Sequence, residues 1–303
     1  MSNPKEIKRR ISSIESVIKT TEAMKMISIV KLKKTKNLLI NVKNYSDHIE
    51  LLFSDFFLIE KKENIQKNKF FLIEKKENIQ KNKLFIVFTS NRGLCGSFNS
   101  SIFEKINFLF QKNNYSYNEC MFFSIGKKGF DFLRKRYKIY DKKNNWINLI
   151  DDFTIIHDNI KFLTKKLILN FIKKDFYSIY LIYNNLKNSL FQEVIIEKLL
   201  PINIENFQKK RKKTEINYLI EPSKKEVFDY LIPKFINTKL LKIFLESSVS
   251  EHTARMISMH KATENALDIK NNLILNYNKE RQTIITKEIL EIISGLESLN
   301  EKK

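Results

Sequence analysis

The two ends of the chain share a helical pattern of apolar positions. Between Leu240 and Leu299, apolar or small residues recur in alternating steps of four and three. They are Leu245, Val249, His252, Met256, Met259, Thr263 and Ala266, and after a gap Ile285, Ile289, Ile292, Leu296 and Leu299. This spacing is typical of a helix that packs along a seam against another helix. Such a helix would be about 90 Å long at its usual rise per residue, so we expect one end to project from any ordinary domain.

The N-terminal stretch supplies a partner for this seam. From Pro4 to about Phe53 the chain has no Gly and no further Pro, and Pro suits the first position of a helix. The seam residues are Ile7, Ile11, Ile14 and Ile18, continued by Leu32, Leu39 and Val42, with small residues Thr21, Ala23 and Ser28 between them. Small side chains let two backbones approach closely. The pattern therefore predicts a long antiparallel coiled coil of the N- and C-terminal helices, with a globular domain inserted between them.

The middle of the chain alternates strand-like and helix-like segments. Apolar runs predict strands at 84–90, 120–125, 154–156, 176–185, 191–202 and 216–220. Helices are predicted from about Asn99, from Gly126 to Arg136, and at 159–173. This alternation indicates a central open α/β, Rossmann-like sheet of parallel strands. Beyond it, Ser223 is expected to cap a short helix that Pro233 breaks or kinks before the long helix begins.

An unchanged fourteen-residue repeat separates the first helix from this domain. The segment FFLIEKKENIQKNK occupies residues 56–69 and again 70–83. Two copies do not make a solenoid, which needs at least three repeats to bury a core. We interpret the pair as an enlarged linker, partly helical or disordered. The predicted organisation is a shaft helix at 1–55, a duplicated linker at 56–83, an α/β domain at 84–222 and a second shaft helix at 223–303.

The charge of the chain is strongly positive. A net charge of +21 and a pI near 9.7 are typical of proteins that meet nucleic acid, an anionic membrane surface or an acidic protein. The abundance of Lys, Asn and Ile is also typical of an AT-rich genome, which reduces the weight of the charge. Cys95 and Cys120 imply no disulfide framework and are expected to be buried thiols. No run of 18 apolar residues and no signal peptide are recognisable.

The candidate chemical motifs are weak. Gly93, Cys95 and Gly96 follow the first strand and could suggest a phosphate loop, but neither G-x-G-x-x-G nor G-K-[ST] is present, so the pattern favours a structural turn. The four His residues lie too far apart in the predicted elements to share a metal. No Ser-His-Asp or paired-carboxylate arrangement stands out either. The sequence predicts no catalytic residue, cofactor or metal site.

Three blocks resemble the bacterial-type ATP synthase gamma subunit family. They are EIKRRISSIESVIKTTEAMKMISIVKLKK, TSNRGLCGSFN and the C-terminal block that contains YNKERQTIITKEILEI. The resemblance spans the chain apart from the repeat. It implies the central rotor shaft of the F1 sector, turning inside a ring of three alpha and three beta subunits, with the α/β domain against epsilon and the c-ring. It also implies a non-catalytic, peripheral subunit on the cytoplasmic side of the cell inner membrane that couples proton flow to ATP synthesis or hydrolysis.

The same resemblance assigns partner contacts to five residues. Arg281 and Gln282 match the pair that hydrogen-bonds a loop of one catalytic subunit, although their polar surroundings alone would suggest a solvated helix face. Met24, Lys25 and Arg255 match positions where the shaft passes the catalytic ring. For Met24 two interpretations stay open, a low-friction bearing surface and plain seam packing.

The turn departs from the family pattern at two positions, with Asn91 where the family usually has Asp and Ser97 where it usually has Gly. Asn91 weakens any role that needs a carboxylate, but it leaves the turn possible.

Two other classes of protein remain as alternatives. A basic coiled-coil protein that binds nucleic acid would explain the charge, but no recognised nucleic-acid-binding signature is present. An α/β enzyme that uses a nucleotide would explain the sheet, and the absent phosphate loop opposes it. The chain is not expected to take a small-molecule substrate or nucleic acid as a partner.

Overall fold

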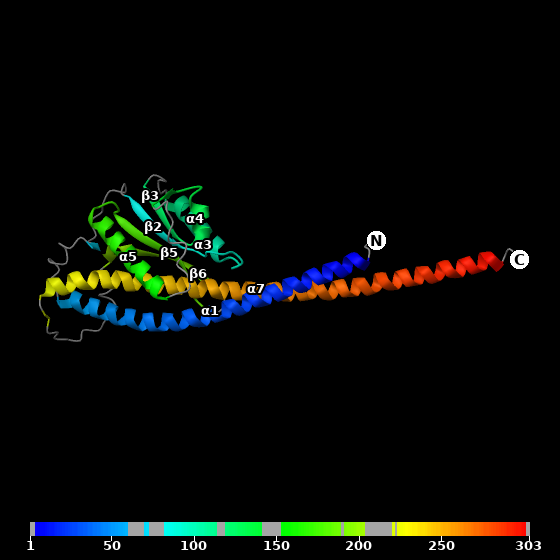
Figure 1. Cartoon of the computed structure of the whole chain (residues 1–303). Helices are drawn as coiled ribbons and strands as arrows, with labels where there is room; N and C mark the ends of the chain where they lie inside the picture. The colour runs from blue at the N-terminus through cyan, green and yellow to red at the C-terminus, as the bar shows by residue number, and fades with distance from the viewer. Residues whose placement is uncertain are drawn as a thin grey trace. The chain divides into compact units, whose positions relative to one another are not determined.

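The computed structural model describes residues 4–59, 70–72, 82–113, 119–140, 153–188, 191–203, 220–221 and 223–300. The chain divides into two compact units, one of residues 1–29 with 255–303 and one of residues 30–254. Two long helices contribute to both units, α1 (Pro4–Ile59) and α7 (Lys224–Asn300) (Figure 1). Both predicted terminal helices are therefore confirmed.

The unit of residues 30–254 contains a five-stranded mixed sheet in the order β4-β3-β2-β5-β6. Its strands are β2 (Lys83–Phe88), β3 (Cys120–Ile125), β4 (Lys138–Ile139), β5 (Ser178–Leu186) and β6 (Gln192–Leu200). Strand β2 lies at the centre and pairs in parallel with β3 and β5, and β4 pairs in parallel with β3.

The prediction of a wholly parallel sheet is wrong at β6, which runs antiparallel to β5. The connection between Leu186 and Gln192 is long enough for a hairpin but too short for the crossover that parallel neighbours require. Strand β4 was not predicted, because two residues are too few to show a pattern.

Helices cover both faces of this sheet, as Figure 1 shows for α3 (Phe98–Asn113), α4 (Lys127–Leu133) and α5 (Phe153–Ile172). Leu84, Ile86 and Phe88 of β2 pack in a cluster with residues of α5, α1 and α7, whereas Phe85 and Val87 pack on the other face with α3. A strand buried on both faces reads as a continuous apolar run, and this is why β2 was recognisable in the sequence.

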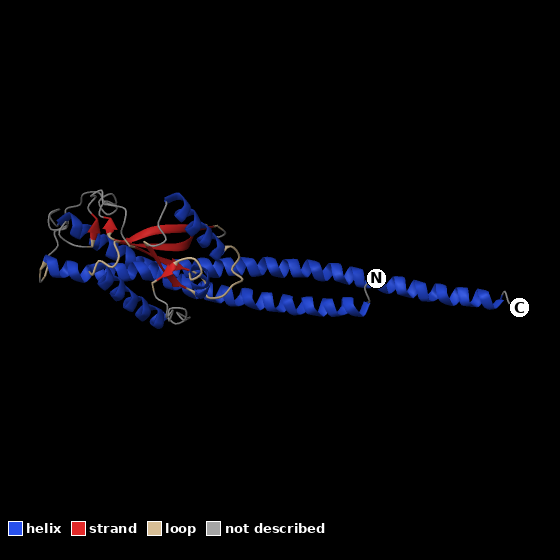
Figure 2. Ribbon diagram, turned by 90° about the horizontal axis from the view of Figure 1, so that it is seen from above, coloured by secondary structure: helices blue, strands red, loops and turns tan. Residues whose placement is uncertain are grey.

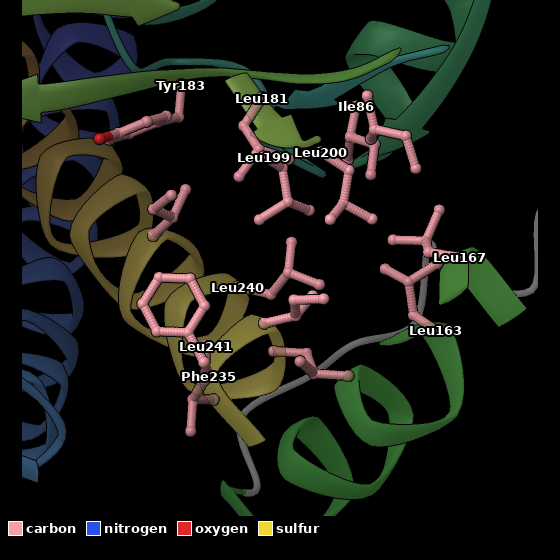
Figure 3. Close-up of a cluster of buried hydrophobic side chains, with 14 of the residues drawn as sticks. Ile86, Leu163, Leu167, Leu181, Tyr183, Leu199, Leu200, Phe235, Leu240 and Leu241 are labelled. Carbon is pink, nitrogen blue, oxygen red and sulfur yellow. The ribbon is translucent and has the colours of Figure 1, made fainter. Parts of the chain in front are cut away.

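The larger cluster joins the sheet to the helices around it. In Figure 3, Leu163 and Leu167 of α5 lie across from Leu240 of α7, below Leu181 and Leu200 of the sheet. Burying a leucine side chain completely stabilises a fold by about 1.5–3 kcal/mol, so this layer holds α5 and α7 against the sheet. Phe53 of α1 joins the same cluster by stacking on Phe235 of α7, with ring centroids 4.7 Å apart.

The predicted strand at 154–156 is wrong, because these residues lie in the first turn of α5. The buried positions of that helix continue a helical period through the segment. They are Ile156, Ile160, Leu163, Leu167 and Phe171. A helical stripe that buries five large side chains outweighs the weak strand preference of a short β-branched run.

Ser223 caps α7 as predicted. Its Oγ accepts a hydrogen bond from the Glu226 backbone N–H at 3.3 Å, as an N-cap side chain does, and donates one to Glu226 Oε1 at 2.9 Å. The predicted break at Pro233 is wrong, because α7 continues through it. Pro233 lacks the backbone N–H that would donate to the carbonyl of Asp229, four residues earlier. Both residues lie on the exposed side of α7, while Ile232 and Phe235 are buried and hold the helix in place.

The two copies of the repeat take part in different elements. Residues 56–59 form the last turn of α1, four residues beyond the predicted boundary at 55. In the second copy, Phe71–Leu72 form β1, which pairs in parallel with β7 (Ile202–Asn203), and Lys83 begins β2. The helix at 56–59 agrees with the interpretation of the repeat as a partly helical linker, whereas the strand residues Phe71–Leu72 and Lys83 were not predicted. Residues 60–69 and 73–81, and the predicted strand at 216–220 except Ile220, lie outside the described residues.

Candidate partner-binding surface of the paired helices

The unit of residues 1–29 and 255–303 contains all five residues that were predicted to contact partners. Met24 and Lys25 lie on α1, and Arg255, Arg281 and Gln282 lie on α7. The structure thus brings these residues into one helical unit, although they are spread along its length.

Two polar contacts set the register of the helices in this unit. Thr263 Oγ1 lies 2.8 Å from Thr21 Oγ1, and Lys270 Nζ lies 2.8 Å from Glu15 Oε1. A step back along α1 is matched by a step forward along α7, so the helices run antiparallel as predicted. The hydrogen bond and positive charge of Lys270 lower the pKa of the Glu15 carboxyl below its usual value.

The seam between the two helices is narrow and built partly from small side chains. Ile7, Ser28, Met259 and Ala266 are buried. Ile7, Met259 and Ala266 were predicted as seam positions, and Ser28 as part of the small central stretch. Small residues allow close backbone approach but bury little apolar area, so polar contacts such as that between Thr21 and Thr263 contribute to the register.

Arg281 and Gln282 lie where the helix pair ends. The register set by Thr21 and Thr263 places residue 281 about level with Pro4, where α1 begins. Both side chains are exposed. Figures 1 and 2 show α7 continuing as a single helix beyond this point. These residues therefore lie at the transition from two helices to one.

The part of α7 that continues beyond the helix pair exposes several large apolar side chains. They are Ile284, Ile285, Ile289, Leu290, Ile292 and Ile293. Ile285, Ile289 and Ile292 were predicted to continue the seam, and this is wrong within the described chain because α1 has no residues opposite them. An exposed apolar surface of this extent is typical of a site that contacts another protein.

The methionines of the shaft divide into two groups. Met24 and Met26 of α1 are 36% and 58% exposed, and neighbouring Ile27 is also exposed. Met259 of α7 is buried in the seam. Seam packing thus describes Met259, whereas Met24 presents a flexible apolar surface that forms no strong directional bonds.

The predicted turn belongs to the other unit and connects β2 to α3. Leu94 and Gly96 adopt positive φ values of 63° and 57°, and glycine tolerates this conformation without strain. Cys95 is buried, and its Sγ accepts a hydrogen bond from Asn99 Nδ2 at 3.2 Å. A Cβ at Gly93 would meet its nearest neighbour only at 3.9 Å, so this position does not require glycine for space.

Asn91 has a defined structural contact in this turn. Its Oδ1 accepts a hydrogen bond of 3.1 Å from the backbone N–H of Lys127, the first residue of α4. An amide oxygen serves this purpose as well as a carboxylate does, so the departure from the family pattern at residue 91 leaves the contact possible.

A partly buried ionic network was missed by the sequence analysis. Lys239 Nζ of α7 lies 2.6 Å from Glu197 Oε1 of β6, and the hydroxyl of Tyr183 donates a hydrogen bond of 3.4 Å to Glu197 Oε2. Burial raises the pKa of Tyr183 and of the nearby Glu246 above their usual values. The sequence signal that could have indicated this network is the spacing of charged residues, three and four apart, among the apolar positions of α7.

A cavity of about 850 Å³ lies beside the edge strand β4. Aromatic side chains, including Tyr137, Tyr140 and Phe176, contribute much of its wall, and Arg134 and Asp175 also line it. None of the five residues predicted to contact partners lines this cavity. Within the described residues, no group of three or more His, Cys, Asp or Glu could hold a metal ion. No described helix combines the length and apolar composition that crossing a membrane requires.

The fold and the exposed helix end define a class of protein, a two-helix shaft that carries an inserted α/β domain. The family model described as ATP synthase matches residues 3–299. The chain is 38% identical over 300 residues to an ATP synthase gamma chain of Christiangramia forsetii, covering 99% of this chain and 100% of that one. It is 37% identical to the gamma chain of Flavobacterium johnsoniae, with the same coverage. The chain belongs to the ATP synthase gamma chain family.

Solved structures show the same fold. A chain in the Euglena gracilis mitochondrial ATP synthase (OSCP, F1 and c-ring) superposes with a TM-score of 0.60 at 19% identity, covering 98% of this chain and 95% of that one. A chain in the Tetrahymena thermophila central stalk and c-ring gives a TM-score of 0.54 at 24% identity, covering 80% and 99%. At these identities the likeness concerns the fold alone.

Proposed function

We propose that this chain is the central rotor shaft of an F-type ATP synthase and couples proton flow to ATP synthesis or hydrolysis. The observation that carries this proposal is the single, apolar end of α7, from Ile284 to Ile293. A long helix with six exposed large apolar residues is unfavourable in water, so it needs an enclosing partner. A ring of alternating alpha and beta subunits would enclose it on all sides.

The asymmetry of the shaft explains how rotation would act on the ring. Two helices are present up to about Pro4 and one helix beyond it. Each turn therefore presents a different surface to each of three catalytic beta subunits. The shaft would change the populations of their conformations through differential contacts, and it would make and break no covalent bond itself.

Arg281 and Gln282 are suited to a contact that forms and breaks once per turn. Arg presents a planar set of donors that can hold a carboxylate through two parallel hydrogen bonds. A hydrogen bond to a charged group stabilises by about 1.5–3 kcal/mol net, which is enough to favour one state without locking it. Further down the shaft, Met24 would act as a bearing surface, and Lys25 and Arg255 would meet acidic loops of the ring.

The α/β domain would form the foot of the shaft. We infer that it contacts the epsilon subunit and the c-ring, so that the turning ring carries the shaft with it. This arrangement makes the chain a peripheral, non-catalytic subunit on the cytoplasmic side of the cell inner membrane. Its excess of positive charge suits a position between an anionic membrane surface and acidic protein loops.

The test uses the complex purified from membranes through an affinity tag on this chain. We expect alpha and beta subunits in equal amounts, with one copy of this chain per three of each. In a second arm, Ile285, Ile289 and Ile292 are each replaced by Asp, which should abolish assembly or coupled ATP synthesis. A matched control places three Asp residues at the exposed polar positions Asn278, Thr286 and Ser294 and should be much less damaging.

Two results would overturn the proposal. One is copurification of nucleic acid with no alpha or beta subunit, which would favour the basic coiled-coil alternative. The other is wild-type assembly and coupled ATP synthesis in the variant with Asp at positions 285, 289 and 292, which would show that the apolar end of α7 needs no enclosing partner.

A further inference from the structure

Helix α5 has two apolar sides, and only one of them packs in the core. Ile160, Leu163, Leu167 and Phe171 are buried against the sheet and α7, as Figure 3 shows for Leu163 and Leu167. On the opposite side of the helix, Phe162 is 62% exposed and Leu169 is 57% exposed. Seven residues are close to two helical turns, so these two side chains lie one above the other.

The outer side carries the spacing of a helix–helix seam. Phe162, Lys165, Leu169 and Ile172 follow one another in steps of three, four and three, and Ile172 is 38% exposed. This is the spacing at which one helix packs along another for two heptads. The long stem of Lys165 can cover apolar surface at its position while its charge stays in water.

The charges along this seam have one sign. Lys161, Lys166 and Lys173 flank the seam positions, and Lys166 also lies over the ring of Tyr140. Asp158 is the one acid between residues 153 and 173, and it lies at the N-terminal end beside His157. A partner that packs on this seam therefore needs acidic residues on both sides of its own apolar stripe.

We propose that the outer side of α5, formed by Phe162, Leu169 and Ile172 with their flanking lysines, is a docking surface for an acidic amphipathic helix of a partner protein. The apolar stripe is only one side chain wide, which fits a single helix better than a membrane surface. The proposal concerns the α/β domain alone and does not depend on the contacts of the shaft.

The experiment measures binding of two fluorescent synthetic peptides to the full-length chain at physiological salt. One peptide has three heptads with Leu at the seam positions and Glu on both flanks. The other has the same composition in scrambled order, so net charge is matched and the seam is removed. We expect the patterned peptide to bind at least about 10-fold more tightly, because only it can bury its leucines against the exposed stripe.

Variants locate the binding on α5. Phe162→Ser with Leu169→Ser should remove the difference between the peptides, with unchanged far-UV circular dichroism because both side chains face away from the core. Phe108→Ser, at an exposed phenylalanine of α3, is the matched control and should leave the difference intact. Lys161→Glu with Lys173→Glu should weaken the Glu-flanked peptide and favour a Lys-flanked one, independently of the apolar substitutions.

Three results would overturn the proposal. Equal binding of the two peptides would show attraction by net charge only. A difference that persists in the Phe162 and Leu169 variant would place the binding elsewhere, including on the exposed end of α7. Binding of phosphatidylglycerol vesicles that depends on Phe162 and Leu169, without discrimination between the peptides, would identify a membrane contact instead.

Discussion

The hydroxyl groups of Thr21 and Thr263 lie 2.8 Å apart, although 242 residues separate them in the chain. Thr21 Oγ1 donates a hydrogen bond of 3.0 Å to the backbone carbonyl of Val17, four residues earlier in α1, so its oxygen can accept the hydrogen bond of Thr263. Since both side chains are small and face the seam, this pair reports the register of α1 against α7.

A disulfide between these positions should test the register. Thr21→Cys with Thr263→Cys should cross-link on mild oxidation, because small facing side chains at this separation suit disulfide geometry. ATP hydrolysis by the assembled complex should stay near the wild-type rate, since both helices belong to the same rotating shaft. The measurements are mobility on a non-reducing gel and the hydrolysis rate.

The control for this cross-link is Thr21→Cys with Lys270→Cys. Residue 270 lies about 10 Å further along α7 than residue 263, so this pair should not cross-link. Efficient cross-linking of the control, or none of the Thr21 and Thr263 pair, would show that the helices have another register.

Substitution of Arg281 and Gln282 should slow the motor without unfolding it. Both side chains are exposed, and alanine favours helix, so Arg281→Ala with Gln282→Ala should leave assembly intact. Loss of a charged hydrogen bond should lower the ATPase rate about 10-fold. Arg281→Lys should rescue only part of the loss, because Lys keeps the charge without the planar donors.

The measurements for this prediction are ATPase rate and proton pumping in assembled complexes. Lys279→Ala, which removes an exposed cation from another side of the same helix, is the matched control and should stay near wild type. Wild-type rates in the double alanine variant would mean that these residues are only a solvated helix face.

Replacement of Glu246 should stabilise the chain at neutral pH. Burial raises the pKa of its carboxyl, an effect that Glu197 of β6 and Glu50 of α1 increase and that Lys242 of α7 and Lys43 of α1 oppose. The folded state thus binds this proton more tightly than the unfolded state, and stability falls as pH rises through the raised pKa. Glu246→Gln should raise the unfolding temperature at neutral pH and lose this advantage near pH 4.

Glu15→Gln is a control of opposite sign. Lys270 lowers the pKa of Glu15, so the stabilisation from Glu15 is present at neutral pH and is lost as pH falls through the lowered value. This variant should lower the unfolding temperature at neutral pH, and its effect should disappear in acid. Thermal unfolding of the full-length chain measures both variants, and shifts of the same sign would contradict the assignment.

The two cysteines should be unreactive in the folded protein. Both thiols are buried, as predicted, and burial raises the pKa of Cys120 to about 11. Only the thiolate is nucleophilic, so alkylation of Cys120 at neutral pH should need unfolding first. Replacing both Cys95 and Cys120 by Ala should leave the ATPase equally insensitive to oxidant and reductant. Redox sensitivity that the double variant abolishes would contradict this.

Removal of one copy of the repeat should be tolerated. Deleting 70–83 or 56–69 produces the same chain. A single FFLI segment then remains, in place of one that ends α1 and one that contributes to β1. Loop length changes cost little entropy, so assembly and coupled ATP synthesis should stay near wild type. Unfolding temperature should fall slightly, because either the last turn of α1 or strand β1 is lost. Failure to assemble would show that both copies are structural.

Much of the fold could be predicted because the relevant signals are local. The seam residues Ile7, Met259 and Ala266 predict paired helices, the apolar run from Leu84 to Phe88 predicts a strand, and Ser223 predicts a helix start. In each case the side chains that bury or cap an element lie within that element, so their spacing is visible in the sequence.

Other features depend on neighbours that the local sequence does not contain. Strand β6 is antiparallel because its connection to β5 is short, and α7 passes through Pro233 because Ile232 and Phe235 are buried on its other side. Likewise Ile285, Ile289 and Ile292 repeat the seam pattern, yet they are exposed because the described part of α1, which begins at Pro4, does not lie opposite them. The predicted contacts of Arg281, Gln282, Met24, Lys25 and Arg255 rest on the family resemblance and await the measurements proposed above.

The repeat shows most clearly which features the sequence determines and which only the tertiary structure decides. The same letters FFLI end a helix at 56–59 and contribute a strand at Phe71–Leu72. The sequence alone determines that this segment is apolar, and it predicted a linker that is partly helical or disordered. Which element forms is decided by position, because the first copy continues an existing helix that needs no new nucleus, whereas the second meets the unpaired backbone of β7 at Ile202.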